Sequence, residues 1–184
     1  LWGTMHTRKW MEKLGVKTHY VTKDGTLKIE MIDERKWTDH IGIYNVFGQS
    51  ENMEMTVYLP AAEYASLQVR TDTGDISIEK PLTVGGNIAT EVNTGRISIE
   101  GEVTCAGMFD AESNTGKILI KAPLSAEDVV VDADTGDVEC FGGILANSVK
   151  VVTDTGNVKL SLKGRKEEYS YTYEVDTGKS NVPS

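Results

Sequence analysis

The residues with the most regular spacing for chemistry are acidic or amide side chains that stand two positions before a recurring glycine. They are Asp72, Asn93, Asn114, Asp134, Asp154 and Asp176. Oxygen ligands suit hard cations such as calcium. The calcium candidates are the three consecutive aspartates, Asp134, Asp154 and Asp176. The pattern differs from the GGxGxD repeat of calcium-loaded β-rolls, however. We therefore expect no bound metal and no cofactor.

The positions directly after the same glycines carry charges of both signs. Asp75 is followed by Arg96 at the equivalent position, and Lys117 is followed by Asp137. Opposite charges on neighbouring strands attract one another. The sequence therefore favours a self-neutralising outer face over a metal site.

Few other polar residues have the spacing of a catalytic site. Asp132 and Asp134 lie on one predicted strand and Asp137 follows the next turn, so the three could imitate the acid pair of a polysaccharide-cleaving enzyme. The histidines lie outside the repeats and lack metal-ligand spacing: His6, His19 and His40. The sequence contains no phosphate loop, nucleophile elbow or HExxH motif. We expect no catalytic residues and a protein that is not an enzyme.

The glycines themselves mark a repeat of Asp or Asn, then Thr, then Gly. They are Gly74, Gly95, Gly116, Gly136, Gly156 and Gly178, with spacings of 21, 21, 20, 20 and 22 residues. Self-similarity at this period indicates stacked supersecondary units. Glycine tolerates positive φ, and Asp or Asn can accept hydrogen bonds from backbone N–H groups two residues on. Each glycine is therefore predicted to form a structural turn.

Apolar residues alternate with polar residues on both sides of each predicted turn. Two positions after the glycines stand Ile76, Ile97, Ile118, Val138, Val158 and Ser180. Alternation of β-branched residues with period two indicates strands. One unit cannot bury its apolar face alone, so stacked units share a core. Residues 67–184 are therefore predicted to form an all-β, parallel β-solenoid with rungs of 20–22 residues, stacked about 4.8 Å apart.

The two ends of the predicted solenoid need covering. Residues 17–66 alternate in the same way and are predicted to form a β cap over the first rung, and residues 1–16 are predicted to be a short N-terminal helix or a disordered lead-in. At the other end, Tyr171 and Tyr173 fall at inward positions, where large rings would close the core. A closed end discourages pairing of strand edges. We expect a monomer in dilute solution.

Composition narrows the classes of partner. The 184 residues carry a formal net charge of -9 at pH 7, which argues against nucleic acid and anionic membrane surfaces. No apolar run approaches the roughly 20 residues of a membrane span, and no signal peptide is present, so we expect no membrane insertion by this segment. Cys140 falls at an inward apolar position and is predicted to be a buried thiol, whereas Cys105 belongs to another column.

Three motifs resemble those of a known family. Residues 57–60 read VYLP, residues 67–71 read LQVRT, and residues 73–78 read TGDISI, a unit that recurs down the chain. Together they are similar to the bacterial β-strand-repeat adhesin-type domain family of unknown function. The resemblance covers about residues 17–182 and implies an extracytoplasmic protein of the cell envelope. No catalytic residues are associated with that family.

The residues and the resemblance together predict a function in binding. We expect a non-enzymatic cell-envelope β-solenoid that acts as a binding or adhesion-like scaffold for a protein or glycan. One alternative is a regulatory envelope-stress accessory that binds a partner protein. Another is a carbohydrate-active β-solenoid enzyme, and a cytoplasmic location is the alternative to the envelope.

Overall fold

The computed structural model of this chain describes residues 4–7, 16–23, 26–33, 55–59, 62, 64–163 and 170–181. Every element in this part of the chain is a β-strand, which confirms the predicted all-β class. The chain forms two compact units, Leu1–Ala62 and Glu63–Ser184. The second unit begins before the predicted residue 67 because Tyr64 already bonds to the first rung, where its carbonyl accepts from Gly85 N at 2.7 Å.

The first unit contains two antiparallel pairs of strands. Strand β1 (Thr4–Thr7) pairs with β4 (Met55–Tyr58), and β2 (Val16–Lys23) pairs with β3 (Thr26–Asp33). The prediction of a helix or disordered lead-in is therefore wrong for residues 4–7, because a partner strand about 50 residues away takes up their backbone hydrogen bonds. The rest of residues 1–15 lies outside the described residues. A cap over the first rung stays a prediction.

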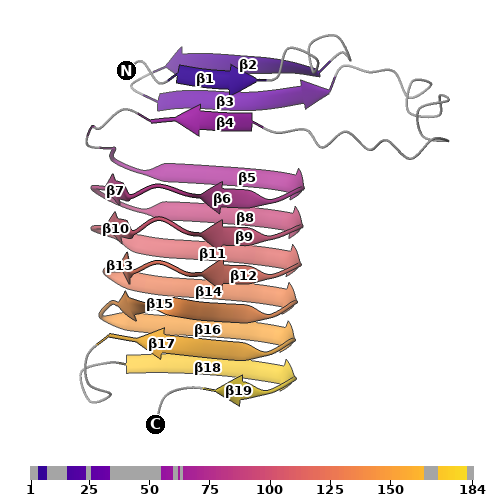
Figure 1. The fold of residues 1–184 in the computed structure, drawn as a ribbon, viewed down its shortest axis with the longest axis vertical. Coiled ribbons are helices and arrows are strands. Elements are labelled where there is room, and N and C mark those ends of the chain that lie inside the picture. The colour runs from indigo at the N-terminus through magenta and orange to yellow at the C-terminus, as the bar shows by residue number, and fades with distance from the viewer. Residues whose placement is uncertain are drawn as a thin grey trace, which may run out of the picture. The chain divides into compact units, whose positions relative to one another are not determined.

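The second unit is a parallel β-solenoid of about five turns, as predicted (Figure 1). The first strands of successive rungs form a six-stranded sheet. They are β5 (Leu67–Thr73), β8 (Ile88–Thr94), β11 (Met108–Thr115), β14 (Asp128–Thr135), β16 (Ser148–Thr155) and β18 (Ser170–Thr177). Their register matches the sequence repeat, so that Phe109 pairs with Ile88 and with Val129.

The remaining strands of each rung form a second parallel sheet. After each turn come β6 (Ile76–Ile78), β9 (Ile97–Ile99), β12 (Ile118–Ile120), β15 (Val138–Leu145), β17 (Val158–Leu162) and β19 (Ser180–Asn181). The first three rungs add a third short strand: β7 (Leu82–Val84), β10 (Val103–Cys105) and β13 (Leu124–Ser125). In the fourth rung β15 runs through both positions, since residues 141–143 read FGG and Ile144 still pairs with Leu124.

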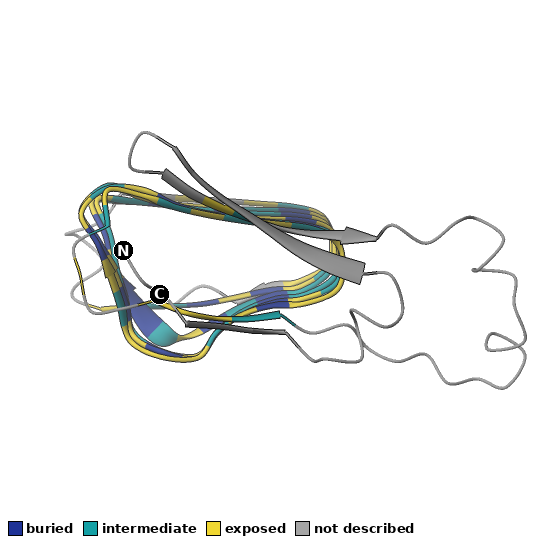
Figure 2. Ribbon diagram, turned by 90° about the horizontal axis from the view of Figure 1, so that it is seen from above, coloured by how far each residue is buried: buried dark blue, intermediate teal, exposed yellow. Residues whose placement is uncertain are grey.

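The core lies between the two sheets and is built from the predicted inward columns. Seen along the stack, the rungs overlie one another with the buried residues at repeating positions (Figure 2). Ile97, Ile118, Val138 and Val158 are all buried, as predicted from their place two residues after a glycine. Cys140 is also buried as a free thiol, and burial raises its pKa to about 12. The side chains of Tyr171 and Tyr173 lie outside the described residues, so their closing of the core stays a prediction.

The turn glycines are required for two separate reasons. Gly74, Gly95, Gly116, Gly136 and Gly178 have φ between +123° and +154°, where a side chain is strained. From Gly95 onward, a Cβ atom would also lie only 1.6–2.1 Å from the carbonyl oxygen of the glycine one rung earlier. Glycine therefore lets consecutive turns stack in direct backbone contact. The predicted structural role of these glycines follows from both features.

Three of the Asp or Asn residues of the turns contribute differently from what the sequence predicted. The side chains of Asp72, Asn93 and Asn114 bond to one another from rung to rung. Asn93 Nδ2 donates to Asp72 Oδ1 at 3.0 Å, and Asn114 Nδ2 donates to Asn93 Oδ1 at 3.3 Å. Parallel register brings identical positions side by side, so a ladder of side chains competes with a local turn bond.

Candidate functional site

The outward side of the six-stranded sheet carries most of the clustered charge. Residues four positions before each turn glycine share one column there, and residues six and two positions before share the columns on either side. We call the acidic members of these columns the acidic face: Asp72, Glu91, Asp110, Glu112, Asp132, Asp134, Asp154, Glu174 and Asp176. They come from β5, β8, β11, β14, β16 and β18.

The centre of the acidic face is a column of three carboxylates on consecutive strands. Glu112 on β11 is in register with Glu91 on β8 and with Asp132 on β14. Neighbouring strands of a sheet are about 4.8 Å apart, so these like charges repel one another. Arg70 partly compensates at one end, where its Nη1 lies 3.2 Å from Glu91 Oε1.

The electrostatics of the face follow first from burial of its carboxylates and second from this crowding. Burial raises the pKa of Asp110, and the charges of Asp132 and Glu91 raise it further. Burial likewise raises the pKa of Glu112, together with the charges of Glu91, Asp110, Asp132 and Asp134. The pKa of Asp132 is raised first by burial and then by Asp134, although Lys150 opposes the change. The charged forms of these three carboxylates are therefore disfavoured in the folded chain, by burial and by one another.

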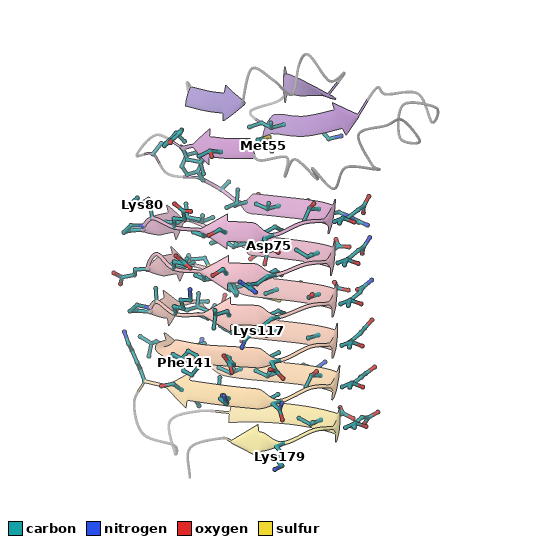
Figure 3. All side chains as sticks on the ribbon, turned by 45° about the vertical axis from the view of Figure 1, so that its right-hand side comes forward. Met55, Asp75, Lys80, Lys117, Phe141 and Lys179 are labelled. Atoms are coloured by element: carbon teal, nitrogen blue, oxygen red, sulfur yellow. The ribbon has the colours of Figure 1, made fainter. Side chains whose placement is uncertain are left out.

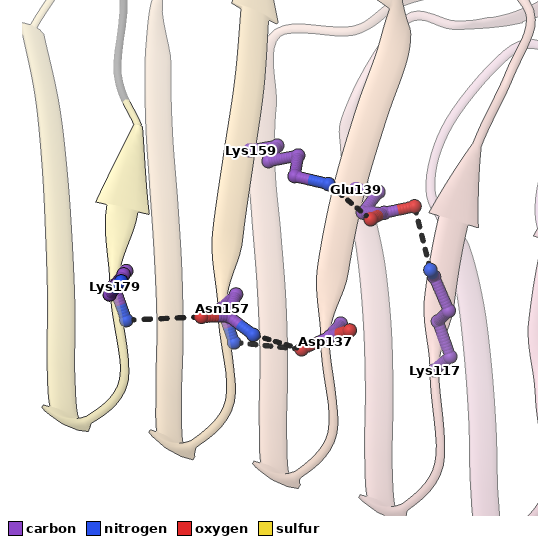
Figure 4. Close-up of polar contacts among 6 residues, drawn as sticks. All are labelled: Lys117, Asp137, Glu139, Asn157, Lys159 and Lys179. Carbon is purple, nitrogen blue, oxygen red and sulfur yellow. Dashed lines mark hydrogen bonds and ion pairs between the residues drawn. The ribbon is translucent and has the colours of Figure 1, made fainter.

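The opposite sheet shows balanced charge instead (Figure 4). Glu139 forms two ion pairs. Its Oε2 lies 2.6 Å from Lys117 Nζ, and its Oε1 lies 2.9 Å from Lys159 Nζ. Its side chain is only 13% exposed, and the two lysines lower its pKa. Lys117 thus pairs with Glu139 rather than with the predicted Asp137, because its long side chain reaches a column two residues away.

The predicted pairing after the first glycine also differs in detail. Asp75 Oδ1 accepts a hydrogen bond from the backbone N of Arg96 at 2.8 Å. The same bond recurs lower in the stack, where Asp137 Oδ1 accepts from Asn157 N at 2.9 Å and Asn157 Oδ1 accepts from Lys179 N at 3.2 Å. Figure 3 shows Asp75, Lys117 and Lys179 along this edge of the solenoid. The column ties rungs together through backbone donors.

Neutralising the centre of the acidic face is expected to stabilise the fold at neutral pH. The raised pKa of Glu112 means that the folded chain disfavours its charged form. The free energy of unfolding is therefore highest below the ordinary pKa of the carboxyl, and it falls as pH rises through the raised value. We expect Glu112→Gln to raise the free energy of unfolding at pH 7 by about 0.5 kcal/mol, an effect that vanishes at pH 3. Urea unfolding at both pH values measures it.

Glu139→Gln is the matched control with the opposite sign. The lowered pKa of Glu139 means that the folded chain favours its charged form. Its contribution to the free energy of unfolding is therefore complete above the ordinary pKa, and it is lost as pH falls through the lowered value. At pH 7 this variant should lose about 1 kcal/mol, and the loss should shrink in acid. If both variants shifted stability in the same direction, the repulsion assigned to the acidic face would be wrong.

The calcium candidates lie at the edge of the acidic face. Asp134, Asp154 and Asp176 are exposed near the ends of β14, β16 and β18, one on each rung. Within the described ranges, no group of three or more His, Cys, Asp or Glu side chains is placed to hold a metal ion. These three aspartates stay candidates from the sequence pattern alone.

Calcium is expected to leave the stability of the protein unchanged beyond a general salt effect. A site that binds only the folded chain would raise the melting temperature as calcium is added. We expect equal, small shifts with calcium and magnesium in thermal unfolding of the parent chain and of Asp154→Ala. A saturable shift that is specific to calcium and disappears in Asp154→Ala would instead establish a site.

The other sequence candidates are not brought together as a catalytic group. Asp132 and Asp134 face outward from β14, whereas Asp137 follows the turn and bonds to Asn157 N and Nδ2. These bonds to Asn157 lower the pKa of Asp137, which suits a structural carboxylate. Among the histidines, His6 and His19 lie on β1 and β2 in the first unit, and His40 lies outside the described residues.

Two features of the surface were missed by the sequence analysis. One is the acidic face, whose signal was present in the positions four and six residues before each glycine. The other is Phe141, which is 56% exposed where other rungs carry Glu79, Glu100 or Lys121 (Figure 3). A break in the polar pattern of one column could have identified it. Leu145, also on β15, is 51% exposed.

Comparison with known proteins identifies one relationship. The family model described as Toastrack DUF4097 matches residues 5–183. This confirms the resemblance to a β-repeat family of unknown function, while an adhesin role is a separate question of function. Comparison with curated proteins and with solved structures gives no match. No helix in the described part of the chain is long and apolar enough to cross a membrane.

Proposed function

Because the chain belongs to the Toastrack DUF4097 family, a β-solenoid family of unknown function, we propose that it is a non-enzymatic binding scaffold of the cell envelope. The proposed partner is a protein or glycan that presents positively charged groups on the extracytoplasmic side. The acidic face is the proposed binding surface. The single observation that carries this proposal is the in-register column of Glu91, Glu112 and Asp132.

A scaffold role is supported by how firmly the fold holds this surface. The strands beneath the acidic face bury a continuous core that includes Phe109, Val129 and Val149. Backbone bonds at the turns also join successive rungs, such as Gly116 N to Thr135 O at 2.8 Å. The backbone of such a sheet holds its side chains at regular spacing. The scaffold therefore loses little conformational freedom when it binds a partner with repeating charges.

The electrostatics support a cationic partner. The pKa values of Asp110, Glu112 and Asp132 are raised first by burial and then by neighbouring carboxylates, which supports a surface that favours added positive charge. A bound cationic group would supply it and would be attracted over several ångströms before contact. Such binding should weaken as salt is added, because the charges are exposed at the surface.

Binding of the full chain to isolated bacterial cell-envelope material tests this function. We compare the parent chain with a triple variant of the acidic face, Glu112→Gln, Asp132→Asn and Asp134→Asn. A matched variant removes as much charge from exposed sites elsewhere: Glu79→Gln, Glu102→Gln and Glu127→Gln. We expect the first variant alone to lose binding. Equal binding by all three chains would rule out the acidic face, and absence of binding by the parent chain would contradict the scaffold function.

The same material distinguishes a scaffold from a carbohydrate-active enzyme. A scaffold leaves the bound glycan intact, whereas a hydrolase or lyase releases new sugar ends. We expect no release of reducing ends or unsaturated sugars from the envelope polysaccharides during prolonged incubation with the parent chain. Release that disappears in Asp132→Asn would favour the enzyme.

A further inference from the structure

We draw no further inference here: the strongest candidate, the exposed apolar surface patch of Phe141 and Leu145 on β15, is an unpartnered face, and nothing in the structure shows what covers it.

Discussion

Replacing Ile99 by aspartate is expected to unfold the solenoid under conditions in which the parent chain is fully folded. Ile99 is 0% exposed on β9 and lies in register between Ile78 and Ile120. An aspartate there would place a carboxylate in the core without a partner, or would force it to bind a proton. We expect a loss of more than about 4 kcal/mol, which is comparable to the whole stability of a small domain. Urea unfolding followed by circular dichroism measures this loss.

The control for Ile99→Asp is Ser77→Asp. Ser77 is exposed on β6, one residue from an inward position, so a new carboxylate there stays in water. We expect a change within about 0.5 kcal/mol. Ser98 is a poorer control although it shares this column, because it is only 8% exposed and its hydroxyl donates to Glu100 Oε1 at 3.2 Å. Equal losses for Ile99→Asp and Ser77→Asp would show that the assigned inward column is wrong.

The inward columns were predictable because residues at equivalent positions of the repeat stack on one another in the core. The first five rungs have an apolar residue two positions after the glycine, and parallel register stacks these residues without any shift. The prediction used no knowledge of the partner strand, since the partner is the next copy of the same pattern. The same reasoning fails for β1, whose partner β4 belongs to no repeat and lies about 50 residues further on.

The acidic face was harder to predict because it depends on spacing across rungs. Glu91, Glu112 and Asp132 become visible as neighbours only when the polar positions four residues before each glycine are aligned, and the register of the strands confirms that they are consecutive. Side-chain length adds a second uncertainty. Lys117 could reach Asp137 in its own column or Glu139 in the column two residues on, and the structure shows it bonded to Glu139. Column analysis therefore locates Cα positions better than it locates ion pairs.

Replacing Gly116 by alanine is expected to cost more than the same change at two other turn glycines. Gly116 combines φ of +148° with a carbonyl oxygen 1.7 Å from the added Cβ. Positive φ costs a residue with a side chain about 1–2 kcal/mol, and forcing apart well-packed neighbours typically costs about 1–3 kcal/mol more. We therefore expect Gly116→Ala to lower the free energy of unfolding by roughly 2–5 kcal/mol. Urea unfolding of the purified variants measures the series.

Two other glycines separate these causes. Gly74 has φ of +123° but no described atom within 4 Å of the added Cβ, so Gly74→Ala should show the conformational cost of about 1–2 kcal/mol alone. Gly156 lies outside the strained φ range, yet its Cβ would lie 2.0 Å from Gly136 O, so Gly156→Ala should show the steric cost alone. If Gly74→Ala cost as much as Gly116→Ala, close stacking of the turns would contribute nothing. A smaller cost for Gly74→Ala means that glycine recurs at these turns because adjacent rungs touch there through their backbones.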